Sequence, residues 1–396
     1  METSLPAAPP PAAPYSLWAL IRYFLRLGSL GFGGPVALIG YMHRDLVAEG
    51  RWISDADYRE GLALAQIAPG PLAAQLAIYL GYVHYRLRGA TLVGLAFVLP
   101  SFLMVLALSV AYAAYGGLPW MQAVFYGVGA GVIGLIAVSA GKLTRKSLGR
   151  DPWLWAYYGV AASVTIITHT EPVLLFLGAG AVQWLRKSPP PGWFRPTGRA
   201  SAVALPGAAL LVALLPRPAA GVLMQIFWFF TKAGAFVFGS GLAIVPFLHG
   251  GVVEQYHWLT DAQFLDAVAV AMITPGPVVI TVAFIGYLVA GLPGACVAAL
   301  ATFLPCYVLT VVPAPYFKKY GQRPALKAFV EGITAAAIGA LSGAVVVLAT
   351  RAVVDVPTAG LAAGTALALW RVRWLSEPVL ILLAAGAGLM LKLAGH

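Results

Sequence analysis

Charged residues are scarce in this sequence. Asp, Glu, Lys and Arg make up only 10% of its 396 residues, whereas 60% are hydrophobic and the mean hydropathy is +0.85. Soluble domains carry about 25% charged residues, so this composition excludes an ordinary soluble protein and indicates a polytopic membrane protein. A membrane span needs roughly 20 apolar residues, and about a dozen segments reach or approach that length.

Cysteine is nearly absent and asparagine is missing altogether. The two cysteines, Cys296 and Cys306, lie in one apolar run, which favours packing roles over a disulfide or a metal site. The sequence also lacks a G-x-x-x-x-G-K-[ST] phosphate loop and an H-E-x-x-H metal motif. We therefore expect a protein that is not an enzyme, with no catalytic residue, no resident metal and no cofactor.

Two Pro-Gly-Pro tripeptides, at 69–71 and 275–277, stand inside apolar segments. Proline removes a backbone N–H and clashes with the preceding helical turn, so neither segment can be one continuous helix. In a bilayer, backbone freed in this way has to be buried in protein or line a wet cavity. Matching breaks in the two halves of a chain point to the binding site of a transporter.

The two breaks belong to an internal duplication. Residues 24–71 align with 230–277 without a gap, with matched Trp, His, Asp and Pro-Gly-Pro residues, and the match continues after a one-residue deletion. We expect a disordered tail at 1–14, an N-terminal transmembrane repeat at 15–185, a cytoplasmic Pro/Arg-rich linker at 186–200 and a C-terminal transmembrane repeat at 201–396.

The distribution of Lys and Arg predicts that the repeats have opposite orientations. Five arginines flank the first broken segment between residues 44 and 88, whereas the second copy has no Lys or Arg between Lys232 and Lys318. Short cytoplasmic loops collect these residues, so the bias favours inverted-topology repeats. Because both flanks of the first segment carry this signal, we predict that 57–85 is a re-entrant hairpin of two half-helices. Its mirror image is then 263–290.

Two structural alternatives stay open at this stage. Each of the segments 57–85 and 263–290 could be a long, kinked spanning helix instead of a hairpin. The segments 17–42 and 219–248 contain Gly-rich breaks, and they either span the membrane or re-enter it as well.

Arg26 and Lys232 stand at equivalent positions within apolar segments. A cation at the centre of a bilayer helix costs roughly 2.5–3.5 kcal/mol on insertion scales, so it is usually paired or functional. The simpler interpretation is that both side chains snorkel to the interface. We favour an anionic substrate as their partner, because the acids near these segments are expected at or near the hairpin entrances. Those acids are Asp55, Asp57, Glu60, Asp261 and Asp266.

Backbone donors complete the predicted anion site. Glycines let N–H groups approach a ligand closely, and the half-helix after each Pro-Gly-Pro presents unsatisfied N–H groups and a positive dipole end. The alternative is that the glycines only permit tight helix packing. The candidate substrate-binding residues are Arg26, Lys232, Gly33, Gly34, Gln66, Pro69, Gly70, Pro71, Gly239, Ser240, Gly241, Pro275, Gly276 and Pro277.

The motifs GFGGPVALIGYMHRDLV, WISDADYREGLALAQIAPGP and ITPGPVVITVAFIGY lie in the duplicated regions. They resemble the chromate ion transporter family, and their presence in both repeats resembles its long, two-domain form. The resemblance implies a bacterial inner-membrane carrier that exports chromate, confers resistance and draws on an electrochemical gradient, with sulfate as a related tetrahedral dianion. Met272 departs from the family, in which Gln often precedes the second Pro-Gly-Pro.

The sequence therefore predicts an all-α polytopic membrane protein of two inverted repeats, each with a helical hairpin broken at Pro-Gly-Pro. We interpret it as a secondary active transporter that exports chromate, and also sulfate, across the inner membrane. An anion channel with the same pore is the first alternative, and a membrane-embedded enzyme acting on lipid-linked phosphate is a more distant one. The expected partners are the oxyanion and membrane lipid, without nucleic acid, and a homodimer is considered.

Overall fold

The computed structural model describes residues 15–32, 34–116, 118–168, 173–189, 221–235, 241, 244–317, 323–372 and 377–393. Every regular element in these ranges is helical, which confirms the all-α prediction. The predicted tail at 1–14 and all of the predicted linker beyond residue 189 lie outside the described residues. So do three of the candidate site residues, Gly33, Gly239 and Ser240.

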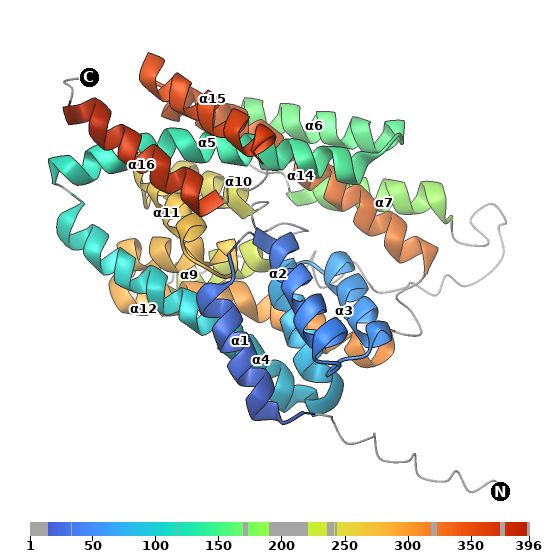
Figure 1. Ribbon diagram of the computed structural model, residues 1–396. Coiled ribbons are helices and arrows are strands. Elements are labelled where there is room, and N and C mark those ends of the chain that lie inside the picture. The colour runs from blue at the N-terminus through green and yellow to red at the C-terminus, as the bar shows by residue number, and fades with distance from the viewer. Residues whose placement is uncertain are drawn as a thin grey trace, which may run out of the picture.

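The two halves contain the same series of elements (Figure 1). Each has a broken first helix, a hairpin at Pro-Gly-Pro, a long helix and two shorter helices. The first half comprises α1 (Leu17–Leu30), α2 (Gly34–Met42), η1 (His43–Glu49), α3 (Asp55–Ile67), α4 (Leu72–Tyr115), α5 (Pro119–Leu148), α6 (Pro152–Thr168) and α7 (Val173–Lys187). The second comprises α9 (Val222–Ala235), α10 (Ile244–His249), η3 (Gly250–Gln255), α11 (Asp261–Ile273), η4 (Val278–Ile280), α12 (Thr281–Val311), η5 (Ala314–Tyr316), α14 (Pro324–Ala352), α15 (Val356–Arg371) and α16 (Glu377–Leu393).

Within the part of the chain that the structure describes, four helical segments are long and apolar enough to cross a membrane, namely 72–115, 119–148, 278–316 and 324–352. They are the corresponding pairs α4 with α12 and α5 with α14. This protein is therefore a multi-pass membrane protein whose longest segments come in matched pairs.

The chain reverses direction at the first Pro-Gly-Pro. α3 ends at Ile67 and α4 begins at Leu72, and a Cβ added to Gly61 of α3 would collide with the Tyr79 ring of α4. Residues on opposite sides of position 70 can touch in this way only if the two half-helices run side by side. The segment 57–85 is therefore a hairpin and not one kinked helix. In the second repeat α11 likewise packs on α12.

Each hairpin is followed by a second sharp turn, at Arg86 (φ 51°) in α4 and at Gly291 (φ 62°) in α12. Across the first of these turns a Cβ on Gly81 would lie against the carbonyl of Gly89, and Gly286 stands in the same relation to its own counterpart in α12. Small residues let helix backbones approach this closely. The helical segment after each turn forms an arm, the α4 arm (residues 87–115) in the first repeat and the α12 arm (residues 292–311) in the second.

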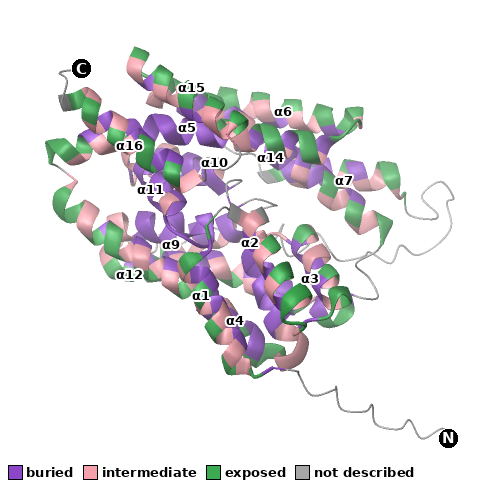
Figure 2. Cartoon of the chain, viewed as in Figure 1, coloured by how far each residue is buried: buried purple, intermediate pink, exposed green. Residues whose placement is uncertain are grey.

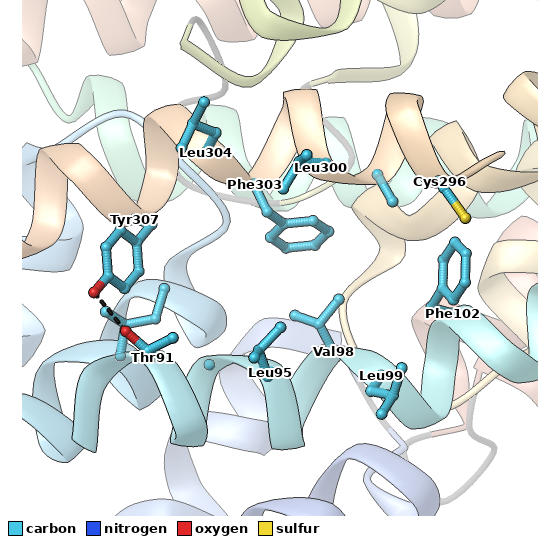
Figure 3. Close-up of a pocket in the computed structure, with 13 residues that line it drawn as sticks. Thr91, Leu95, Val98, Leu99, Phe102, Cys296, Leu300, Phe303, Leu304 and Tyr307 are labelled. Carbon is cyan, nitrogen blue, oxygen red and sulfur yellow. Dashed lines mark hydrogen bonds between the residues drawn. The ribbon is translucent and has the colours of Figure 1, made fainter. Parts of the chain in front are cut away.

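The two arms pack against each other through residues that are equivalent in the duplication (Figure 3). They line an apolar groove of about 460 Å³. At one end the hydroxyls of Thr91 and Tyr307 are hydrogen-bonded at 2.7 Å. The equivalent pair at the other end is Cys296 and Phe102, and Phe102 has no hydroxyl. The backbones of the arms are thus related by an approximate two-fold axis. The side chains at the two ends of the groove are not identical. Matched lining residues are Leu95 with Leu300, Val98 with Phe303 and Leu99 with Leu304.

The last two helices of each repeat pack on the long helix of the other repeat. α6 and α7 lie against α14, and α15 and α16 lie against α5 (Figure 1). A Cβ on Gly332 of α14 would collide with the carbonyl of Ala179 in α7, and one on Gly127 of α5 with that of Ala384 in α16. Figure 2 shows the buried faces of α5 and α11 inside this arrangement. Each repeat therefore completes the packing of the other.

Candidate anion-binding site

The broken segments of the two repeats meet in the interior. The backbone N–H of Gly276, in the second Pro-Gly-Pro, donates a hydrogen bond of 3.1 Å to the carbonyl oxygen of Gly31, just after α1. Ser101 of the α4 arm is fully buried, and its hydroxyl lies 2.7 Å from the carbonyl oxygen of Pro275 and 3.3 Å from that of Gly28. The first repeat thus fixes the position of the break in the second.

The converse contact is made at the first Pro-Gly-Pro. A Cβ on Gly70 would lie 3.2 Å from Cβ of Cys306, the residue of the α12 arm that is equivalent to Ser101. The side-chain amide of Gln75 donates a hydrogen bond of 2.8 Å to the carbonyl of Pro69. Gly70 has φ 143° and Gly276 has φ 99°, backbone conformations that favour glycine. The arm of each repeat therefore lies against the break of the other.

The helix after the first break begins without a side-chain cap. Pro71 precedes Leu72, and no side chain accepts from the first turn of α4. Such a terminus leaves backbone N–H groups unsatisfied and carries partial positive charge. In the second repeat a 3₁₀ turn at η4 intervenes, with the N–H of Ile280 bonded to the carbonyl of Pro277. Both helix starts lack a side-chain cap, but only the first is α-helical directly after its Pro-Gly-Pro, which is the form expected of an anion site.

Arg26 lines a cavity of about 700 Å³ beside the Gly31 turn. The same cavity carries Asp45, which accepts a hydrogen bond of 3.1 Å from Tyr23 and forms an ion pair of 2.7 Å with Arg44. Among the described residues no carboxylate pairs with Arg26, whose side chain is exposed. A positive charge is therefore directed into an open cavity that already contains a satisfied acid.

A second, much smaller cleft lies on the other side of the Gly31 turn. Gly31 and Phe32 line both spaces, and the cleft of about 10 Å³ is completed by Met272, Thr274 and Gly276, with Glu377 at the start of α16. A volume of roughly 10–15 Å³ holds one water molecule, so the cleft admits no larger species. The wide cavity and the second break are thus neighbours separated by one narrow turn.

A family model described as chromate transporter matches the chain at residues 18–184 and again at 224–389. The chain belongs to the chromate transporter family. A chromate transport protein of Cupriavidus metallidurans is 67% identical over 382 residues, covering 96% of this chain and 94% of that relative. A probable chromate transport protein of Synechococcus elongatus is 60% identical over 95% of this chain and 96% of its own length. The chromate transport protein of Pseudomonas aeruginosa is 32% identical over 97% and 94%, respectively. No solved structure matches the chain.

In this member of the chromate transporter family, the predicted site residues are only partly brought together. Gly241 is buried beside Val279, so it lies close to the second break, and Gly34 begins α2. Gln66 is exposed on α3 and lines neither cavity, whereas its counterpart Met272 is buried and lines the cleft. The candidate residues Pro71, Pro275 and Pro277 are buried with the two central glycines, and Pro69 is half-buried.

Lys232 lies in the last turn of α9, half-buried and engaged with a neighbouring group. Neither of the two cavities beside the Gly31 turn is lined by Lys232. The equivalence of Arg26 and Lys232 in the sequence therefore does not translate into equivalent surroundings in this conformation.

Asp266, expected at or near a hairpin entrance, stands in the second turn of α11 and is only 7% exposed, because α4, α5 and α12 all pack against that helix. Sequence reasoning also missed Ser101 and Glu377. Ser101 follows the matched proline of its arm, just as Cys306 does, and Glu377 is an acid that opens an apolar segment. Both features can be seen in the sequence, but they indicate a functional role only once the fold places the two residues beside the second Pro-Gly-Pro.

Proposed function

We propose that this protein is a secondary active transporter that exports chromate across the bacterial inner membrane, with sulfate as a second substrate. The names of the relatives support the substrate, since three of them are called chromate transport proteins. Their bacterial sources are consistent with an inner-membrane location. Transport of an intact oxyanion needs charge and hydrogen-bond donors but no catalytic group, and we propose no enzymatic step.

The observation that carries this proposal is the meeting of the two breaks beside a cation. The Gly31 turn is hydrogen-bonded to Gly276 on one side and forms part of the Arg26 cavity on the other. In a bilayer, non-helical backbone is tolerated where it is buried in protein or lines a water-filled cavity. We propose that the hairpins are re-entrant, that they enter from opposite faces, and that the oxyanion is held at their junction.

The chemistry of the junction suits a dianion. Arg26 supplies a delocalised charge with several N–H donors. The uncapped start of α4 lines neither cavity in the described conformation, and we propose that its backbone N–H groups reach the anion during the transport cycle. We propose that Lys232 and the glycine turns of the second repeat provide the equivalent contacts when the second cavity opens. The anion is then transferred across the junction as one repeat rocks against the other, with the contact between the α4 arm and the α12 arm as the moving contact.

The closed cleft supports a carrier over a channel. A volume of about 10 Å³ at the second break admits no oxyanion while the Arg26 cavity is open on the other side. A carrier exposes its site to one face at a time, whereas a channel needs a continuous path. Saturable uptake with counterflow therefore fits this geometry, and ionic currents far above the turnover of a carrier would contradict it.

The test is uptake of labelled chromate and labelled sulfate into everted membrane vesicles, each with the other anion as competitor. The Arg26→Gln and Lys232→Met variants should lose uptake while remaining in the membrane. Arg22→Gln is the matched control, because Arg22 lies on the same helix and is exposed outside the cavity. Full transport by Arg26→Gln would refute its role. Wild-type vesicles that take up neither anion would refute the function.

A further inference from the structure

The second hairpin contains a buried carboxylate that the proposed anion path does not use. Asp266 in α11 is 7% exposed, and its Oδ2 accepts a hydrogen bond of 2.7 Å from the hydroxyl of Tyr112. Tyr112 belongs to the α4 arm of the other repeat, and its ring packs on Phe284 and Phe125 at 5.1 Å between centroids. Acids inside membrane proteins are costly to bury and commonly serve ion or proton pathways.

The first hairpin carries an equivalent acid with a different kind of partner. Glu60 corresponds to Asp266 in the duplication, and its carboxylate is hydrogen-bonded to the hydroxyl of Tyr79. Tyr79 lies in the same hairpin as Glu60, and its counterpart in the second repeat is Phe284, which has no hydroxyl. In the second repeat the missing donor is replaced by Tyr112.

The tyrosine that bonds Asp266 is also replaced by phenylalanine in the matching position of the other repeat. The counterpart of Tyr112 on the second repeat is Phe317, which is buried in the core around the first hairpin. In both pairs of matched aromatic positions, the first repeat has the tyrosine and the second repeat the phenylalanine. The tyrosine that bonds Glu60 is in the hairpin, and the tyrosine that bonds Asp266 is at the end of the arm. The Glu60 bond stays within one hairpin. The Asp266 bond joins a hairpin of one repeat to the arm of the other, so it depends on their relative position.

No other charged group of the described chain contacts Asp266. Asp266 is surrounded by protein that buries it, and the hydroxyl of Tyr112 is its one hydrogen-bond donor among the described side chains. Among the charged side chains on the elements around α11, His249 of α10, Glu254 of η3 and Arg351 of α14 are clustered around Asp261 at its N-terminal end, and Glu377 of α16 lines the small cleft. The remaining charged side chains of these elements do not act on Asp266. They are His84, Arg86 and Arg88 of α4, Lys142, Arg145 and Lys146 of α5, Lys327 and Glu331 of α14, and Lys392 of α16.

We propose that Asp266 is the proton-binding residue of the transport cycle, ionised while Tyr112 donates to it and protonated when the α4 arm moves away. The inference rests on the proposed function and adds the coupling ion to it. A desolvated carboxylate without a donor is unstable as an anion and takes a proton from water. When the hydroxyl of Tyr112 returns, it stabilises the anion and the proton leaves to water on the other side. No other bond changes.

Coupling follows from the position of the hydrogen bond. Motion of the arm against the hairpin is the same motion that we propose for alternating access, so the proton state of Asp266 and the accessible face change together. Glu60 has no such link, because its donor moves with it. The matched acids therefore make different predictions, and one serves as the control for the other.

The experiment uses the purified full-length protein in proteoliposomes and two assays. The first measures exchange of labelled chromate at equilibrium without a gradient, and the second measures accumulation driven by an imposed pH gradient. Asp266→Asn should retain exchange and lose accumulation above the equilibrium level. Glu60→Gln should retain both. Tyr112→Phe should retain accumulation with its pH profile shifted to higher pH, and Tyr79→Phe should leave the profile unchanged.

The outcomes separate this inference from the function on which it rests. Wild-type protein that neither exchanges nor accumulates chromate overturns both. Wild-type exchange without gradient-driven accumulation overturns the proton site alone, as does full accumulation by Asp266→Asn. Loss of exchange in Asp266→Asn with an unchanged size-exclusion profile also overturns it, because the residue then serves anion movement itself. If Asp266→Asn does not fold, an unshifted pH profile in Tyr112→Phe overturns it.

Discussion

The hydroxyl of Ser101 in the first repeat donates a hydrogen bond of 2.7 Å to the carbonyl oxygen of Pro275 in the second. The donor lies on the α4 arm and the acceptor lies in the second Pro-Gly-Pro, so the contact joins two elements that a rocking motion would separate. The equivalent residue of the other arm is Cys306, a weak donor that packs against Gly70 instead. The two halves of the junction therefore differ in strength.

A methyl group at the second break should disrupt this junction. In Gly276→Ala the new Cβ would collide with Oγ of Ser101, at a backbone φ of 99° that strains any side chain. We expect a loss of about 1–3 kcal/mol from the strained backbone and a further ~1–3 kcal/mol from overpacking. Thermal unfolding in detergent measures the effect.

Two further variants sharpen that measurement. The double variant Gly276→Ala with Ser101→Gly should recover part of the loss, because the collision is removed while the strain remains. Gly386→Ala is the control, since a Cβ added at Gly386 would meet no other atom within 4 Å. Wild-type stability in Gly276→Ala would contradict the contact between Ser101 and the second break.

Close packing of α5 on α15 should make two glycines of one helix behave oppositely. A Cβ on Gly134 would collide with the carbonyl of Ala362, whereas nothing lies within 4 Å of one on Gly141. We expect Gly134→Ala to cost about 1–3 kcal/mol of stability. Gly141→Ala should be neutral or stabilising by about 0.5–1 kcal/mol through helix propensity. Equal melting temperatures for the two variants would argue against the packing of α15, from the second repeat, on α5 of the first.

Asp151, between α5 and α6, should make stability depend on pH. Burial alone would raise the pKa of its carboxyl, but hydrogen bonds from the Trp153 backbone N–H, Gln183 and Arg186 outweigh burial and hold that pKa below its ordinary value. A lowered native pKa contributes stability that is present above the unfolded value of about 3.9 and is lost as pH falls through the native value. The melting temperature should therefore drop below about pH 4.

The Asp151→Asn variant isolates this contribution. It should be less stable than wild type at pH 7, and the difference should shrink as the pH is lowered below about 4. Glu49→Gln is a suitable control, because Glu49 is an exposed acid. A stability difference between Asp151→Asn and wild type that stays constant with pH would show that the charge of Asp151 is not the source.

Opposite orientation of the hairpins can be tested at two matched surface positions. Arg51 and His257 are equivalent in the duplication, are both exposed, and have φ of 51° and 50°. In a Cys296→Ser background, where Cys306 is fully buried, Arg51→Cys and His257→Cys should react with a membrane-impermeant maleimide from opposite sides. Labelling of both from the same side would exclude inverted repeats.

The local breaks were predictable from sequence because they depend on single residue types. Two prolines around a glycine at 69–71 remove two backbone N–H groups within three residues and favour a break. Thr260 and Gln263 form a capping box at the start of α11, which a Thr three residues before a Gln favours. The duplication extends the same argument to the second repeat. The break inside 57–85 therefore followed from chemistry that is local in the chain, whereas the hairpin was inferred from the arginines on both of its flanks.

The surroundings of the side chains could not be read in the same way. The burial of Asp266 depends on Tyr112, which lies 154 positions earlier in the chain, and no periodicity encodes such a contact. Arg26 and Lys232 match in sequence, yet Arg26 is exposed to a cavity and Lys232 is half-buried. Equivalent residues have different environments because the two repeats adopt different conformations around them.

The exchange of helix pairs sets an order of assembly during synthesis. α6 and α7 find their packing surface on α14, which the ribosome makes only after residue 323 has emerged. Until then, the faces of α6 and α7 that pack on α14 have no protein partner in the nascent N-terminal half, and lipid or an insertion chaperone has to cover them. A chain cut between the repeats should therefore mature only when both fragments are produced together in the same membrane.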